Sequence, residues 1–188
     1  MTRVSFVIFV TLLLIACTAK APLAGTALEA RDAPDFTLTD GLTGSAVSLS
    51  SLRGRVVALS FLYTRCQDTC PLTAAKFRAA QNTLGTDAVH FVAVSVDPDG
   101  DTPAAVRAFS EKYELSAGWR YLIGTRAQLQ TVWALYGVGA FGRSMDSAVD
   151  HNDAIFVIDR KGRERELIHS DVKLANLVAD LRALANQP

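Results

Sequence analysis

Residues 56–71 read VVALSFLYTRCQDTCP, and this stretch decides the fold. Its first seven residues are apolar except for one serine, which predicts a buried strand over Val56–Leu62. Asp68 and Pro71 are typical of the start of a helix, and the alanine-rich residues behind them continue it to about residue 84. A strand that passes directly into a helix indicates an α/β protein.

Two cysteines, Cys66 and Cys70, lie at this junction. A helix N-terminus offers amide donors and the positive end of a dipole, so we expect it to lower the pKa of the thiols, and Arg65 adds a positive charge. Residues four apart share one face of a helix, so both sulfurs can face one soft metal ion or each other. Two buried cysteines that act only as small apolar side chains are the alternative. The three polar residues between them, 67–69, favour an exposed turn instead.

Residues 1–17 have the form of a secretory signal. One positive charge at Arg3 is followed by an apolar stretch from Val4 to Ala16, which is short for a membrane span. The sequence LIAC that ends at Cys17 resembles the lipobox of bacterial lipoproteins, in which the cysteine carries the lipid after cleavage. We therefore expect lipidation of Cys17 and a membrane-anchored domain on the extracytoplasmic, periplasmic side. An ordinary signal peptide or an uncleaved anchor is the alternative, with the same placement of the domain.

The rest of the chain divides into a linker and one domain. Residues 18–32 are rich in alanine and lack periodicity, which predicts a flexible tether. Residues 33–188 are enough for one domain with a proper core. The 19 basic residues balance 19 acidic ones and are scattered, so the charge pattern argues against a nucleic-acid partner.

The apolar runs of the domain predict strands that alternate with helices. The expected strands are residues 35–39, 46–49, 56–62, 89–96, 154–158 and 163–168, and the expected helices are residues 68–84, 103–114, 127–135 and 174–184. The first two strands and the last two each form a hairpin. This order predicts a thioredoxin-like α/β fold, a three-layer sandwich with an N-terminal β-hairpin extension.

Five segments in this order resemble the SCO/SenC proteins. They are APDFTL (33–38), SLRGR (51–55), the cysteine run up to Pro71, VSVDPDGDTP (94–103) and VDHN (149–152). The resemblance implies that Cys66, Cys70 and His151 bind copper. It also implies a metallochaperone that helps to assemble the copper centre of cytochrome c oxidase by delivering copper, by reducing client cysteines, or both. The implied partners are the copper-centre subunit of the oxidase or another copper chaperone.

The residue types suit this chemistry. Thiolates and imidazole favour Cu(I), and the same set with a water or carboxylate can hold Cu(II). His151 stands among polar residues just before an apolar strand, and a neighbouring carboxylate can orient its ring. His90 and His169 are expected to be surface or structural residues. Asp97 and Asp101 are expected to form turns and helix caps.

A thiol–disulfide oxidoreductase or a redox-signalling protein is the alternative function, with Cys66 and Cys70 as a redox-active disulfide. The three residues between the cysteines argue against exchange as the only role, since oxidoreductases of this fold typically use C-x-x-C. Peroxiredoxins place a threonine or serine three residues before the attacking cysteine, where this chain has Tyr63. A thiol–disulfide reductase activity is therefore the one enzymatic role that the sequence leaves open.

Overall fold

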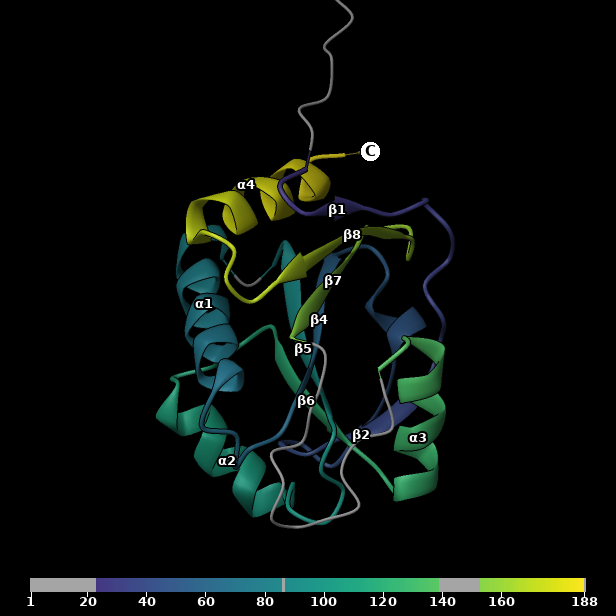
Figure 1. Ribbon diagram of the computed structural model, residues 1–188, viewed down its shortest axis with the longest axis vertical. Coiled ribbons are helices and arrows are strands. Elements are labelled where there is room, and N and C mark those ends of the chain that lie inside the picture. The colour runs from purple at the N-terminus through teal and green to yellow at the C-terminus, as the bar shows by residue number, and fades with distance from the viewer. Residues whose placement is uncertain (1–22, 86, 139–152, 188) are drawn as a thin grey trace, which may run out of the picture.

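Eight strands form one mixed sheet in the computed structural model, which describes residues 23–85, 87–138 and 153–187 (Figure 1). The strands are β1 (Thr26–Ala27), β2 (Thr37–Asp40), β3 (Ala46–Ser48), β4 (Val56–Leu62), β5 (Val89–Ser95), β6 (Trp119–Ile123), β7 (Ala154–Ile158) and β8 (Glu164–His169). Their order across the sheet is β1-β8-β7-β4-β5-β6-β2-β3. Strands β4, β5 and β6 run parallel, and all other neighbours pair antiparallel.

Helices cover both faces of this sheet. They are α1 (Thr69–Leu84), α2 (Pro103–Lys112), α3 (Arg126–Leu135), α4 (Leu174–Ala185) and the short 3-10 helix η1 (Leu49–Leu52). Helices α1, α2 and α4 pack on one face, and α3 and η1 pack on the other (Figure 1). This arrangement confirms the predicted thioredoxin-like fold. Within the described ranges, none of these helices has the length and apolar character needed to cross a membrane.

The predicted element boundaries agree with the structure where local signals are strong. Strand β4 spans the predicted residues, and all seven of them are buried because the sheet is covered on both faces. Helix α1 begins one residue later than predicted and ends before Gly85, whose φ of 77° favours glycine. Helix α2 begins at Pro103, and the Thr102 side chain caps it by accepting the Ala105 amide at 3.2 Å.

Strand β6 is an element that the sequence patterns did not reveal. Its five residues, WRYLI, have a charged arginine inside a short apolar run, so neither alternation nor a continuous buried run is apparent. In the structure, the Arg120 guanidinium donates to the Trp119 carbonyl at 2.8 Å and lies 3.7 Å from the Asp40 carboxylate. The charge is therefore partnered at the half-buried position, while Trp119 and Tyr121 are buried in the core.

The N-terminal arm, residues 23–33, lies along the edge strand β8. Strand β1 pairs with β8, and the Leu28 amide donates to the Arg165 carbonyl at 3.0 Å. The sequence predicts a tether over residues 18–32, whereas the described part of that segment is held against the sheet. A two-residue strand has no local signal, because its hydrogen-bond partners are supplied by the open edge of β8.

Candidate metal centre

Cys66 and Cys70 lie where β4 passes into α1. Cys66 is in the turn after β4, and Cys70 is the second residue of α1. The Asp68 side chain makes no capping hydrogen bond, and the Cys70 amide instead donates to Cys66 Sγ at 3.4 Å. Both cysteines are thiols, with exposed fractions of 7% and 0%. Residues 67 and 68 are exposed, as expected of this turn, but the two cysteine side chains are buried in the core cluster beneath α1.

The electrostatics of the pair also differ from the sequence expectation. The pKa of the Cys70 thiol lies well above its usual range, first because of its hydrogen bond with the Cys66 side chain and then because of burial. Arg65 does not offset this effect, because its guanidinium binds Asp97, 2.6 Å away, and its side chain is 63% exposed. The Cys70 thiol thus retains its proton until a cation or a covalent S–S bond replaces it.

The buried Asp101 side chain binds the turn that carries Cys66. Its carboxylate is 3% exposed and accepts the Thr64 amide at 2.8 Å and the Thr64 hydroxyl at 2.7 Å. It also accepts the hydroxyls of Ser95 at 2.6 Å and Tyr121 at 2.9 Å. Burial raises the pKa of Asp101, and these four hydrogen bonds oppose the rise. Since Thr64 lies two residues before Cys66, this carboxylate joins the cysteine turn to β5 and β6.

From the sequence, Asp97 and Asp101 were predicted to form turns and helix caps, and this is confirmed for Asp97 alone. Its Oδ1 accepts the Gly100 amide at 3.0 Å and closes the turn after β5. Asp101 does not cap α2, since Thr102 has that role. The buried Ser95 inside the apolar run of β5 was the available sequence signal for a polar partner at this position.

His151 and Cys17 lie outside the described residues, but the described strands define where the chain returns to the sheet. Strand β7 pairs antiparallel with β4, with Ile155 opposite Ser60, and the Ser60 hydroxyl donates to the Ala154 carbonyl at 3.1 Å. The start of β7 therefore lies at the same end of the strands as the C-terminal end of β4, where the cysteine turn begins. His151 precedes Ala154 by three residues, which span at most about 10 Å.

The two other histidines have structural partners, in agreement with the prediction from the sequence. His90 is on β5, and its Nε2 is 3.1 Å from the Arg55 guanidinium; burial and this neighbouring charge lower the pKa of His90. His169 ends β8, and its Nδ1 is 2.8 Å from the Asp153 carboxylate. Asp153 also accepts the Ser170 hydroxyl at 2.8 Å, which anchors the start of β7 beside the end of β8.

Within the described ranges, no three histidine, cysteine or acidic side chains gather as metal ligands. The structure brings together two of the predicted ligands, Cys66 and Cys70, in adjacent positions. The donor set fits a soft cation, because two thiols at the start of a helix match the preference of Cu(I) for sulfur.

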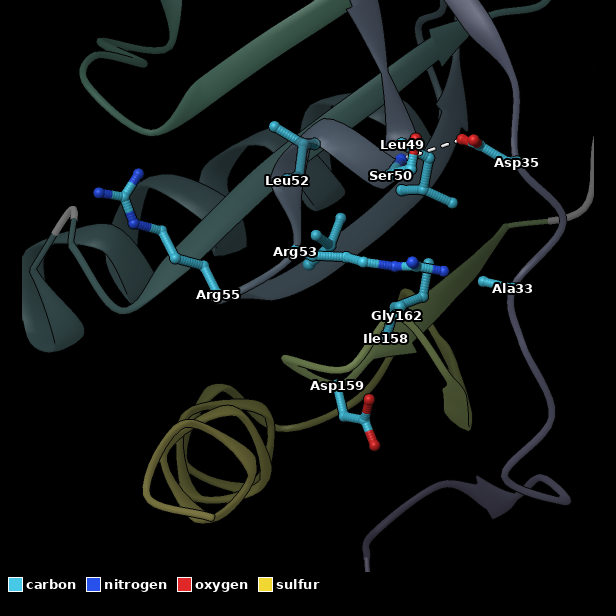
Figure 2. Close-up of a pocket in the computed structure, with 11 residues that line it drawn as sticks. Ala33, Asp35, Leu49, Ser50, Leu52, Arg53, Arg55, Ile158, Asp159 and Gly162 are labelled. Carbon is cyan, nitrogen blue, oxygen red and sulfur yellow. Dashed lines mark hydrogen bonds between the residues drawn. The ribbon is translucent and has the colours of Figure 1, made fainter. Parts of the chain in front are cut away.

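A separate cavity lies at the opposite end of β4 (Figure 2). It is small, with a volume of about 20 Å³, and is lined by Ala33, Asp35, Leu49, Ser50, Leu52, Arg53, Arg55, Val57, Ile158, Asp159 and Gly162. Its acidic groups are already engaged: Asp35 accepts the Ser50 amide at 2.9 Å, and Asp159 binds Arg163 at 2.8 Å. The acidic groups of the cavity are thus not available for catalysis or metal binding. Among the described residues, the cysteine pair is the candidate reactive site.

Comparison with known proteins agrees with this geometry. A family model described as SCO1/SenC matches residues 25–186. The chain is 29% identical over 125 residues to the SCO1 protein homolog of Bacillus subtilis (strain 168), which covers 64% of this chain and 65% of that protein. It is 29% identical over 136 residues to a putative copper-binding protein of Stutzerimonas stutzeri, with 69% and 66% covered. The chain therefore matches about two thirds of the length of these relatives.

A solved structure of Bradyrhizobium japonicum ScoI with copper bound is also similar. Its TM-score is 0.71 at 28% sequence identity, over 81% of this chain and 99% of that one. The likeness confirms the resemblance that the five sequence segments indicated.

Proposed function

This chain belongs to the SCO1/SenC family, and from that membership we propose that it binds copper through Cys66, Cys70 and His151. The observation that carries the proposal is the position of two adjacent thiols beside the start of β7. Strand β7 begins three residues after His151. Copper here is cargo rather than a resident cofactor. The proposed role is to help assemble the copper centre of cytochrome c oxidase, with its copper-centre subunit or another copper chaperone as partner.

Each part of the chain has a defined task in this proposal. The Cys66 and Cys70 thiols lose two protons when they take up Cu(I), and the His151 imidazole adds a third, neutral donor. A carboxylate or a water can complete a set for Cu(II). Because the thiols come from a turn and a helix start and the histidine from a remote segment, the site opens when either part moves. This suits a protein that passes its metal on by ligand exchange.

An anaerobic Cu(I) competition titration of the reduced full chain tests the proposal. We expect one tightly bound copper, and we expect His151→Ala to weaken it about 10- to 100-fold because the two thiolates remain. The same variant should lose the copper(II)–thiolate absorption while its unfolding transition is unchanged.

His169→Ala is the matched control, since it removes an exposed imidazole at the end of β8. It should leave the Cu(I) affinity unchanged. Equal affinities in the wild type and His151→Ala would remove His151 from the site.

Thiol–disulfide exchange is the second candidate function, and the hydrogen-bonded contact between the two cysteine side chains favours it. Two thiols this close can release two protons and two electrons to an oxidised client and form one S–S bond. Weak copper binding that is indifferent to His151 would favour this function over metal delivery. The reduction potential of the Cys66–Cys70 pair would then be the decisive property.

Lipidation of Cys17 would place the domain at the membrane on the periplasmic side. The support is the LIAC sequence, together with the apolar stretch before it. We expect an intact-mass spectrum of membrane-extracted protein to show a chain that begins at Cys17 and carries the mass of a lipid. A chain without added mass, or one that retains residues 1–16, would contradict the lipoprotein assignment.

A further inference from the structure

Two carboxyl side chains meet under the N-terminal arm, far from the cysteine pair. Glu166 on β8 is 0% exposed and Asp180 on α4 is 7% exposed. The Gly25 amide donates to Glu166 Oε1, and the Ala24 amide donates to Asp180 Oδ2 at 3.0 Å. The other oxygen of Glu166, Oε2, has no hydrogen-bond partner among the described residues. A buried carboxylate oxygen without a donor is costly, and a proton on it removes that cost.

We propose that Glu166 and Asp180 hold one proton between them and form a pH-sensitive latch that fastens the N-terminal arm to the edge of the sheet. The proton bonds to Glu166 Oε2 and is donated to the Asp180 carboxylate, so the pair carries one negative charge. Each carboxyl group then keeps an oxygen for one arm amide. This inference does not depend on copper binding.

The backbone of the arm fits this site closely. A Cβ atom on Gly25 would lie 2.5 Å from the Leu167 carbonyl oxygen, so only glycine allows the arm to approach β8 at this point. Strand β1 follows directly and pairs with β8. In Figure 1, β1 lies over β8 beside α4, at the end of the domain where the C-terminus is marked. The carboxyl pair thus accepts two consecutive amides of the docked arm, those of Ala24 and Gly25.

No cation neutralises the pair among the described groups that face it. On β8, Glu164 shares the face of Glu166 but is bound by Arg31 at 3.0 Å, and Arg165 alternates to the opposite face. On α4, Arg182 follows Asp180 by two positions and therefore lies on another face of the helix. Val157 of β7 and Ala27 of β1, which pair with Glu166, are uncharged, as are the buried Leu177, Leu181 and Leu184 of α4. Two negative charges in this position would repel each other without compensation.

The direction of the pH effect follows from linkage. Burial raises the pKa of Glu166 from 4.5 to about 7; the Gly25 amide opposes the rise, and the charge of Asp180 adds to it. When the arm undocks, water reaches the carboxyl group and restores its ordinary affinity for protons. The docked arm therefore binds the extra proton between about pH 5 and 7. Over this range docking weakens as the pH rises, and it levels off above pH 7.

Amide hydrogen exchange of the full chain, resolved by residue and corrected for the intrinsic rate, tests the latch. In the wild type, we expect the protection of Leu28, whose amide is bonded to β8, to fall about tenfold or more from pH 5 to 8. Glu166→Gln cannot ionise, so its protection should be independent of pH over this range. Asp180→Asn keeps an oxygen for the Ala24 amide and removes the repulsion, while the burial of Glu166 remains, so it should reduce the pH dependence without abolishing it.

Glu164→Gln is the matched control on the same strand. It removes the contact with Arg31 and should loosen the arm at every pH while it retains the pH dependence. Asp180→Asn keeps the test valid if Glu166→Gln does not fold. A wild-type profile without pH dependence, or a profile of wild-type slope in the folded Glu166→Gln or Asp180→Asn chains, would overturn the proposal.

Discussion

Replacing Cys70 with serine should abolish tight Cu(I) binding and lower the affinity by more than about 100-fold. Loss of a residue that only orients a metal ligand can already lower the affinity by about 100-fold, and loss of a ligand should cost more. Serine has nearly the same shape as cysteine, so the fully buried position stays filled. Its hydroxyl does not ionise near neutral pH, and its oxygen is a hard donor that a soft cation disfavours. The measurement is the same competition titration, on chains shown by their unfolding transitions to be folded.

Cys66→Ser should have an effect of the same order, because each variant leaves one thiolate. Cys17→Ser is the matched control for the substitution itself, and its affinity measured in detergent should equal that of the wild type. Full affinity in the Cys70→Ser chain would show that copper is bound elsewhere. It would therefore contradict the proposed centre while leaving the latch at Glu166 unaffected.

Replacing Asp101 with alanine should destabilise the domain by about 3 kcal/mol, because buried donors lose their acceptor. The Ser95 and Tyr121 hydroxyls are both completely buried, so water cannot replace the carboxylate there without rearrangement. Asp101→Asn retains the shape and one oxygen acceptor, and its loss should be about 1 kcal/mol. Urea unfolding checks both values, and the midpoint should shift while the slope m is unchanged.

Asp99→Ala is the matched control in the same turn. Asp99 is 70% exposed and pairs with the half-exposed Arg126, so its removal should change stability by less than about 1 kcal/mol. The Asp101 variants should also weaken Cu(I) binding, since the Thr64 amide and hydroxyl that hold the cysteine turn lose their partner. Equal stability of the Asp101→Ala and Asp99→Ala chains would show that the four hydrogen bonds contribute nothing.

Local patterns in the sequence were sufficient for much of the architecture. The apolar run of β4, the proline that begins α2 and the glycine that ends α1 act through neighbouring residues, so their effects can be read without the fold. Strand β6 was missed because Arg120 interrupts its pattern, and a remote carboxylate on β2 partners that charge. Strand β1 was missed because two residues form a strand only where another strand offers its edge.

By itself, the sequence determined the thioredoxin-like fold, the family and the C-x-x-x-C pair, because these depend on residue types at short spacing. Only the tertiary structure decided that both sulfurs are buried, that the pKa of Cys70 is raised, and that Asp101 holds the cysteine turn. It alone brought Glu166 and Asp180 under the arm. The physical reason is that burial, shared protons and hydrogen-bond satisfaction depend on neighbours that are remote in the chain, and no local pattern records them.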